Sequence, residues 1–342
     1  MIAHAGKRTL TLENRPYLLS HAAAVGKKEG EGPLGSRFDF VTRNDRMGQK
    51  SWELAESELQ RTAIDLALRK GSLRHCDLDL ILAGDLLNQC IGSFLASMHS
   101  DVPYLGQYGA CSTMAQGLAL GGVLVESGAA ARLAVSASSH FCSAERQYRF
   151  PLAYGGQRTP TAQWTATAAG AAVLGAEGGS SVRMTHVLFG KMIELGVKDA
   201  NNMGAAMAPA AAATLLRYLH DTGQEPKEFD AIYTGDLGHL GSRLFREILT
   251  AEGLVMKNHI DCGSILYDAA RQNVKSGGSG PGCCAAVLCG HILPRLERGS
   301  YRRVLFIATG ALMSQTTFLQ KESIPAIAHL VELRGPECTA RG

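Results

Sequence analysis

The chain has 342 residues, of which 46% are hydrophobic and 19% are charged, so it can bury the core of one large domain or of two fused ones. The formal net charge is only +3 and the basic residues form no stripe, which excludes nucleic acid as an expected partner. Nine cysteines without CxxC spacing argue against a zinc site and favour a reducing compartment.

The first residues contain no apolar run of the length that a signal peptide needs. The longest apolar stretch, residues 110–125, is too short and too rich in glycine to span a bilayer, so we expect a buried helix there. The chain is therefore expected to be a soluble protein of the cytoplasmic type, and any membrane location would depend on partner proteins.

The chain repeats a pattern of strands and helices. Residues 79–86 and 230–237 both read as an apolar strand that ends in Gly-Asp-Leu. Residues 109–136 match residues 280–307 at a constant offset, with the same Gly, Glu, Gly and Arg at corresponding positions. Each copy predicts a helix, a strand, a Gly-Asp loop, a Gly-rich turn, a buried helix and a second strand.

We expect the helices before the two Gly-Asp strands at residues 61–70 and 211–220. Strands that alternate with helices predict largely parallel sheets covered by helices, with the two apolar helices packed together at the centre. Residues 141–163 have no counterpart in the second copy, and we expect them to form a long loop at the surface or at a dimer interface.

The two copies divide the chain at the Gly-Gly-Ser-Ser segment, residues 178–181. We therefore predict an N-terminal half at 1–180 and a C-terminal half at 181–342.

Cys111 stands where a Gly-Ala turn meets the first apolar helix. A thiol at a helix N-terminus meets free N–H groups and the positive end of the helix dipole, and both favour a nucleophilic thiolate. The alternative is a small buried side chain, and spacing alone does not decide between them. Gly282 is the matching residue of the second copy. It either lets a ligand approach the backbone or lets the two helices pack closely.

A nucleophilic cysteine needs a base, usually a histidine. His140 follows a strand and His239 follows a Gly-Asp-Leu-Gly segment, so either one is a candidate for the pocket, although a lone histidine in a loop is more often a surface residue. We expect His259 to be solvated in a polar turn and His291 to be packed within a helix.

Asp85 and Asp236 end equivalent strands of the two copies. Two carboxylates at matching strand ends could flank one cleft. They could equally cap the helices that follow, which is the commoner use of aspartate after glycine.

The duplicated unit resembles the thiolase and ketoacyl-synthase superfamily, and the resemblance rests on Gly-Ala-Cys-Ser at 109–112 and on the Gly-Ala-rich strand at 169–174. This resemblance implies an α/β protein with a thiolase-like fold, in which the two halves form five layers in the order α-β-α-β-α. It also implies a homodimer, since the superfamily usually pairs through the edge of a sheet.

A closer resemblance is to the stage V sporulation protein AD family of spore-forming bacteria. It is carried by the segments at 138–140, 144–147, 154–157, 234–237 and 276–280. That family is understood to bind dipicolinic acid, free or with calcium, and to serve its transport into the developing spore and its release in germination. Membrane proteins of the same operon would be its partners and would hold it at the spore inner membrane.

Ketoacyl synthases that use an acyl carrier protein place a catalytic histidine where this chain has Gly235 and Asp236. An ionised aspartate would oppose the negative charge that builds up in condensation, so the resemblance implies a binding protein without catalysis. The ligand-binding residues that it implies are Asp85, Cys111, Ser112, Ser138, His140, Asp236, His239, Gly278 and Ser279. Because calcium prefers oxygen ligands, Asp85 and Asp236 could bridge to the acid through calcium. The alternative is that one of the two aspartates is protonated or orients a donor, and the sequence does not decide between them; no other cofactor is expected.

Two alternatives remain open. The first is an acyl-transfer enzyme that uses Cys111 as its nucleophile and His239 or His140 as its base. The second is a structural scaffold for membrane partners.

Overall fold

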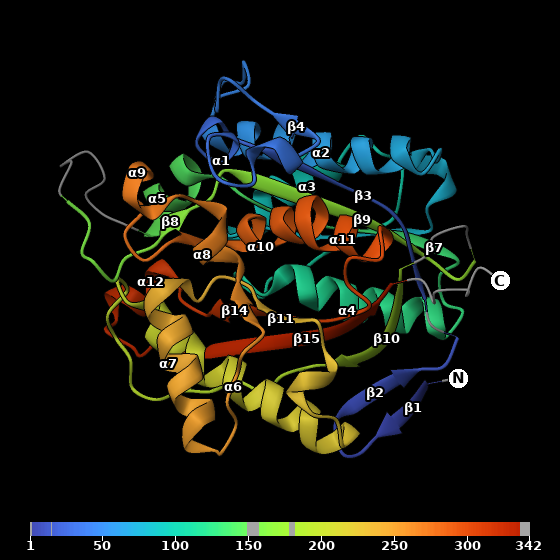
Figure 1. The fold of residues 1–342 in the computed structure, drawn as a ribbon. Helices are drawn as coiled ribbons and strands as arrows, with labels where there is room; N and C mark the ends of the chain where they lie inside the picture. Colours follow the sequence, from blue (N-terminus) through green and yellow to red (C-terminus); the bar gives the residue numbers. More distant parts are fainter. Residues whose placement is uncertain (1, 15, 149–156, 178–181, 336–342) are drawn as a thin grey trace.

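Two matching five-stranded sheets carry the fold of the computed structural model, which describes residues 2–14, 16–148, 157–177 and 182–335 (Figure 1). The first sheet runs in the order β3-β9-β7-β5-β6 and the second in the order β10-β15-β14-β11-β12, and the pairing of Tyr17 with Arg183 joins β3 to β10, so that the two sheets are continuous at this edge. The first contains β3 (Tyr17–Val25), β5 (Leu80–Gly84), β6 (Tyr104–Gly106), β7 (Arg132–Ser139) and β9 (Ala168–Gly175). The second contains β10 (Arg183–Leu188), β11 (Ala231–Thr234), β12 (His259–Asp261), β14 (Arg303–Ala311) and β15 (Ala326–Arg334).

The strand directions repeat as well. In the first sheet β9 is antiparallel to both of its neighbours, while β7, β5 and β6 are parallel. In the second sheet β15 takes the place of β9, and β14, β11 and β12 are parallel. The predicted duplication and the largely parallel sheets are therefore present, with one reversed strand in each half. The predicted boundary at 178–181 lies outside the described residues.

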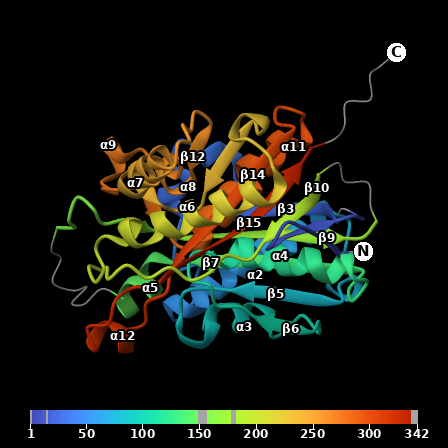
Figure 2. The ribbon, with the colours of Figure 1, turned by 90° about the horizontal axis from the view of Figure 1, so that it is seen from below.

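Helices form three layers around the sheets, which gives the five-layered α-β-α-β-α arrangement of the thiolase fold (Figures 1 and 2). One outer layer is α2 (Trp52–Lys70) and α3 (Ile91–Ser97), and the other is α6 (Met203–Thr222) and α7 (Gly238–Ala251). The central layer is α4 (Thr113–Glu126) with α10 (Pro281–Val287), which continues through a π-helical turn (Leu288–Ile292) into α11 (Leu293–Glu297). Helix α4 contacts both sheets.

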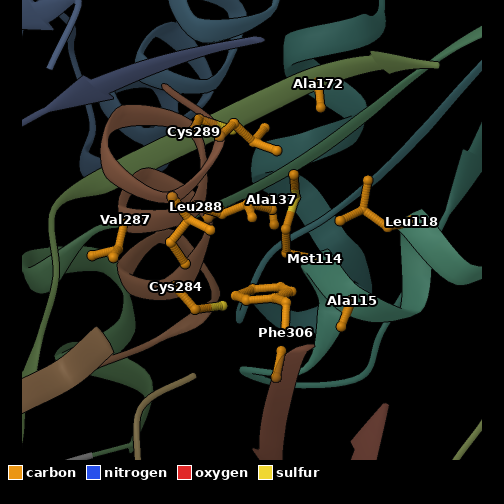
Figure 3. Packing of buried hydrophobic residues seen from close by; sticks show 14 of the residues in the cluster. Met114, Ala115, Leu118, Ala137, Ala172, Cys284, Val287, Leu288, Cys289 and Phe306 are labelled. Carbon is orange, nitrogen blue, oxygen red and sulfur yellow. The ribbon is translucent and has the colours of Figure 1, made fainter. Parts of the chain in front are cut away.

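The centre of the core is built from small and sulfur-containing side chains. Met114 of α4 lies between Leu288 of the π-helical turn and Leu118, and Phe306 of β14 lies below it (Figure 3). Small residues let backbones approach closely. A Cβ atom at Gly282 would lie 2.0 Å from the carbonyl oxygen of Ala168, so close packing of α10 against β9 explains this glycine.

The shorter strands and α-helices are β1 (Ile2–Ala5), β2 (Thr9–Leu12), α1 (Lys27–Gly30), β4 (Phe40–Val41), α5 (Phe141–Tyr148), β8 (Trp164–Thr165), α8 (Cys262–Leu266), α9 (Ala269–Gln272), β13 (Gly278–Ser279) and α12 (Gln315–Leu319). The loop predicted at 141–163 is wrong in its first part, because α5 continues directly from β7. Phe141 stacks on Trp164 at a ring distance of 4.0 Å, which fixes this helix to β8.

Within the described ranges, no helix combines the length and the apolar character needed to cross a membrane.

Candidate functional site

Cys111 lies at the sharp turn before α4. Ala110 adopts a φ of 49°, a left-handed conformation that is uncommon for a residue with a side chain. Ser112 occupies the N-cap position of the helix but makes no capping hydrogen bond with its side chain. The Cys111 Sγ atom lies 3.9 Å from the Ser279 Oγ atom, so the turn before α4 and the turn before α10 meet here. Burial raises the pKa of the Cys111 thiol well above its usual value, and the nearby carboxyl of Asp236 raises it further. The helix start therefore does not produce the thiolate that the sequence suggested.

Asp236 lies behind Cys111 and Ser279, at the end of β11. Its Oδ2 atom accepts hydrogen bonds from the Gly280 backbone N–H (2.8 Å) and from the Ser279 hydroxyl (3.2 Å). Its Oδ1 atom accepts one from the Thr309 hydroxyl (3.1 Å). The side chain is fully buried, and burial raises its pKa to about 7. Asp236 therefore changes charge near neutral pH.

A small cavity opens beside Cys111, with a volume of about 40 Å³. That is room for about three water molecules, because one water needs roughly 10–15 Å³. Its polar lining comes from Cys111, Ser279, Thr165 and Glu145. Any larger ligand therefore needs the cavity to widen.

Two tyrosines and a methionine cover the cavity. The Tyr108 hydroxyl lies 3.3 Å from the Tyr148 hydroxyl and donates to the Met313 carbonyl oxygen at 3.4 Å. The Tyr148 hydroxyl donates in turn to the carbonyl oxygen of Leu86. Tyr148 and Met313 also line an outer hollow of about 210 Å³ that α12 borders. The two side chains thus stand between the inner cavity and the surface.

Glu145 is a site residue that the individual residues did not reveal, although the segment 144–147 contributed to the family resemblance. It is buried on α5 and accepts a hydrogen bond from the Thr165 hydroxyl at 3.1 Å. Its second oxygen pairs with the Arg158 guanidinium at 3.0 Å, and that guanidinium also lies over the rings of Phe141 and Trp164. The cavity therefore has a cation held directly behind its buried carboxylate.

Asp85 and Ser138 belong to a different buried cluster, centred on Glu56. The Ser138 hydroxyl donates to Glu56 Oε1 at 3.1 Å. Asp85 accepts hydrogen bonds from the Leu87 N–H (2.7 Å) and from the N–H and hydroxyl of Ser93 (2.7 and 2.6 Å). Burial raises the pKa of both carboxyls, and the charge of Asp85 raises that of Glu56 further. Of the two uses expected for Asp85, the structure shows the capping of the following helix.

The two histidines proposed as bases lie away from the Cys111 cavity. His140 is buried, and its Nε2 atom lies 2.8 Å from the Asp45 carbonyl oxygen. His239 is exposed on α7, where its backbone N–H donates to Ser276. Within the described part of the chain, no histidine lines the cavity.

The expectation for His259 is wrong and that for His291 is confirmed. His259 lies in β12, with its ring centre 4.6 Å from that of Phe245 and its Nε2 atom 2.9 Å from the Thr234 hydroxyl. Burial lowers its pKa to about 4. His291 is buried in the π-helical turn.

The remaining predicted residues support the turns around the cavity. The Ser112 hydroxyl donates to the Gly109 carbonyl oxygen at 2.6 Å. Gly278 pairs with Trp164 in the small β13–β8 sheet, and its carbonyl oxygen accepts from the Gln163 side chain at 2.8 Å. Among the described residues, no group of three or more His, Cys, Asp or Glu side chains is placed to hold a metal ion.

Solved structures place this architecture in the thiolase fold. 3-Oxoacyl-[acyl-carrier-protein] synthase III from Aquifex aeolicus is 12% identical, with a TM-score of 0.56, and the match covers 93% of this chain and 99% of that one. Cerulenin-bound OleA from Xanthomonas campestris is 15% identical, with a TM-score of 0.59 and coverage of 94% and 96%. At such identities the likeness establishes the fold alone.

The sequence identifies the family within this fold. The model of the family described as stage V sporulation protein AD matches residues 6–334. Stage V sporulation protein AD of Bacillus subtilis (strain 168) is 43% identical over 325 residues, which cover 95% of this chain and 96% of that relative. The chain therefore belongs to the stage V sporulation protein AD family, and it is a sporulation protein with a thiolase-like fold.

Proposed function

We propose that this protein binds dipicolinic acid (pyridine-2,6-dicarboxylic acid) in the Cys111 cavity without catalysing a reaction. It serves the movement of this acid into the developing spore and its release in germination. The observation that carries the proposal is the set of groups around Cys111. Hydroxyl groups, backbone N–H groups and a carboxyl with a raised pKa surround a protonated thiol, and the described cavity lining contains no histidine. These groups suit an acidic ligand better than they suit thiolate chemistry.

The charges around the cavity set the conditions for binding a dianion. A neutral Asp236 leaves no negative charge behind Ser279, whereas an ionised Asp236 would repel the ligand. Arg158 offsets the charge of Glu145 through their contact of 3.0 Å. Because the pKa of Asp236 is raised to about 7, we expect free dipicolinate to bind more tightly as the pH falls through neutrality.

The bridging role proposed for calcium meets an obstacle in this arrangement. Every carboxylate oxygen of Asp85 and Asp236 already accepts a hydrogen bond, and neither side chain lines the cavity. Calcium that binds together with the acid would therefore have to displace these donors. Such binding would strengthen with rising pH, because calcium needs the ionised carboxylate.

Ligand entry requires the tyrosine cover to move. A pyridine diacid exceeds a cavity of about 40 Å³, so Tyr148 and Met313 have to swing away and join the cavity to the outer hollow of about 210 Å³. The hydrogen bonds of Tyr108 and Tyr148 would break in this step. We propose that the widened cavity is the form that binds the acid.

The competing function is acyl transfer through Cys111. The solved structures with this fold include condensing enzymes, and the turn at Ala110 presents Cys111 at the start of α4. The raised pKa of the thiol weakens it as a nucleophile.

We place the protein at the spore inner membrane through membrane partners of the same operon, which is likewise a proposal.

Calorimetric titration with dipicolinic acid at pH 6 and pH 8, with and without calcium, tests the proposal. We expect calcium-free affinity to fall by about tenfold between the two pH values as Asp236 ionises. Asp236→Asn should remove most of this dependence. Glu29→Gln is the matched control: Glu29 is also buried with its pKa raised to about 7, but it accepts hydrogen bonds from Tyr267 and Thr167 and does not contact the turns beside Cys111.

Two results would contradict the proposal. One is an absence of saturable binding under all four conditions. The other is a covalent acyl adduct on Cys111 after incubation with a coenzyme A thioester, detected by mass spectrometry and absent from Cys111→Ala. If the affinity for the acid rises with pH only when calcium is present, the ionised carboxylates bind calcium, and calcium links them to the acid.

A further inference from the structure

A second hollow lies on a different part of the molecule, between the β1–β2 turn, the end of β10 and α6 (Figure 1). Its volume is about 460 Å³, and it shares no lining residue with the Cys111 cavity. The charged side chains at its rim are Lys7, Arg8, Lys191 and Arg217, with Glu252 as the one acid. These five side chains sum to a charge of +3, so this basic groove alone carries as much net positive charge as the whole chain.

The chain holds the rim in place through Asp221. The Asp221 carboxylate accepts hydrogen bonds from the backbone N–H groups of Lys7 (3.1 Å), Arg8 (3.0 Å) and Thr9 (3.1 Å). It also pairs with Arg217 at 3.2 Å. The turn of the hairpin is thus fixed by its backbone, and the Lys7 and Arg8 side chains remain exposed.

The cations of the basic groove are largely unpaired. Lys7, Arg8 and Lys191 are exposed, and within the described ranges no carboxylate forms an ion pair with any of them. Like charges held near one another repel, which an anionic partner would relieve. Charge complementarity therefore points to an acidic occupant.

The floor of the basic groove is apolar. Leu188 is only 1% exposed, Phe189 is 36% exposed, and Leu216 lies beside them on α6. Beyond Phe189 the chain exposes two more large apolar side chains, Met192 (57%) and Leu195 (68%). A recessed floor of this kind can be filled by single side chains of a peptide, whereas a flat bilayer surface cannot reach it.

We propose that the basic groove docks an acidic peptide segment of a partner protein, with carboxylates on the rim and apolar side chains on the floor. The carboxylates of the segment lie against Lys7, Arg8 and Lys191, and its apolar side chains contact Leu188 and Phe189. The inference stands apart from the ligand of the Cys111 cavity, because the two hollows share no residues.

Fluorescence anisotropy with three labelled synthetic peptides tests this docking site. One peptide alternates Glu with Leu, the second alternates Glu with Ser, and the third alternates Gln with Leu. We expect the Glu-Leu peptide to bind best and to weaken with added salt, because both the rim and the floor contribute.

The variants locate the binding. Lys7→Glu/Lys191→Glu should weaken binding of the Glu-Leu peptide by about tenfold or more, since the rim charges are reversed. Lys50→Glu/Arg69→Glu makes the same charge change at exposed positions on and next to α2, on the other side of the molecule, and should leave binding within about twofold. Phe189→Ala tests the floor with the rim left intact, and it should weaken the Glu-Leu peptide only.

Several results would overturn the proposal. An equal loss in both double variants would mean non-specific attraction. Equal binding of the Glu-Ser and Glu-Leu peptides would mean that the floor is unused, and no binding of any peptide would leave no docking site. Vesicles containing anionic phosphatidylglycerol that bind through Lys7 and Lys191, while the peptides do not, would assign the basic groove to a membrane surface instead.

Discussion

At the scale of single residues, the two symmetry-related aspartates have different surroundings: Asp236 lies beside Cys111, and Asp85 lies beside Glu56. Cys111, Ser279 and Asp236 meet because the two Gly-rich turns converge. The repeat predicted that the two central helices pack together, and the family resemblance placed these three residues in one site. Asp85 lies apart, against Glu56, because its oxygens cap the start of α3. The sequence could not decide whether an aspartate after glycine lines a cleft or caps a helix. It did not predict that Glu56 is buried either, because a glutamate on a helix is usually a surface residue and its serine partners are distant in the sequence.

The raised pKa of Asp236 predicts how stability depends on pH. The folded protein holds this proton up to about pH 7, whereas an unfolded aspartate releases it near its ordinary value of 3.8. Stability is therefore lost as the pH rises between these values, by at most about 4 kcal/mol from this group. Asp236→Asn does not titrate, so the melting temperature of wild type should fall relative to that of the variant from pH 5 to pH 8. A difference that stays constant would contradict the raised pKa.

At the scale of elements, the duplication made both sheets predictable, and the apolar helix expected at 110–125 is α4. The helix expected at 61–70 is longer, since α2 begins at Trp52 and its first half is rich in charged residues that carry no apolar signal. The segment at 141–163 was read as a loop because it lacks a counterpart, yet α5 brings Glu145 and Tyr148 to the cavity. The sequence did not predict that α5, which has no counterpart in the second copy, packs against β8.

The central packing predicts a costly substitution at Gly282. An added methyl group would lie 2.0 Å from the Ala168 carbonyl oxygen, so α10 would have to move away from β9. Gly282→Ala should lower the free energy of unfolding by about 2 kcal/mol or more, measured by urea denaturation. Gly106→Ala is the control, because its methyl group would meet only the tip of the Tyr104 side chain, at 3.0 Å, and its cost should be small. Equal costs would show that the central layer is looser than described.

At the scale of the whole molecule, the five layers leave one sheet edge open in each half. Strand β6 ends the first sheet, and apolar side chains are exposed beside it at Leu105 (50%), Phe94 (39%) and Met98 (58%). These features suit the homodimer that we propose, in which two β6 edges pair. The edge could not be identified before the strand order was known, although the likeness to the superfamily suggested a dimer.

A charge at this edge should separate the proposed dimer. Leu105→Lys should shift the mass measured by light scattering from dimer to monomer, since two lysines would face each other across the pairing axis. Val255→Lys introduces the same charge at a side chain that is 70% exposed on another part of the molecule, and should leave the mass unchanged. A wild-type monomer, or a dimer that Leu105→Lys leaves intact, would rule out pairing through β6.

The most direct test of the central claim is a crystal structure of the protein grown with dipicolinic acid. We predict the acid beside Cys111 and Ser279, in a cavity widened by movement of Tyr148 and Met313 toward the outer hollow, with Asp236 behind it. A structure with the acid bound elsewhere, or with the cavity closed and empty at saturating acid, would contradict the assignment of this cavity as the binding site.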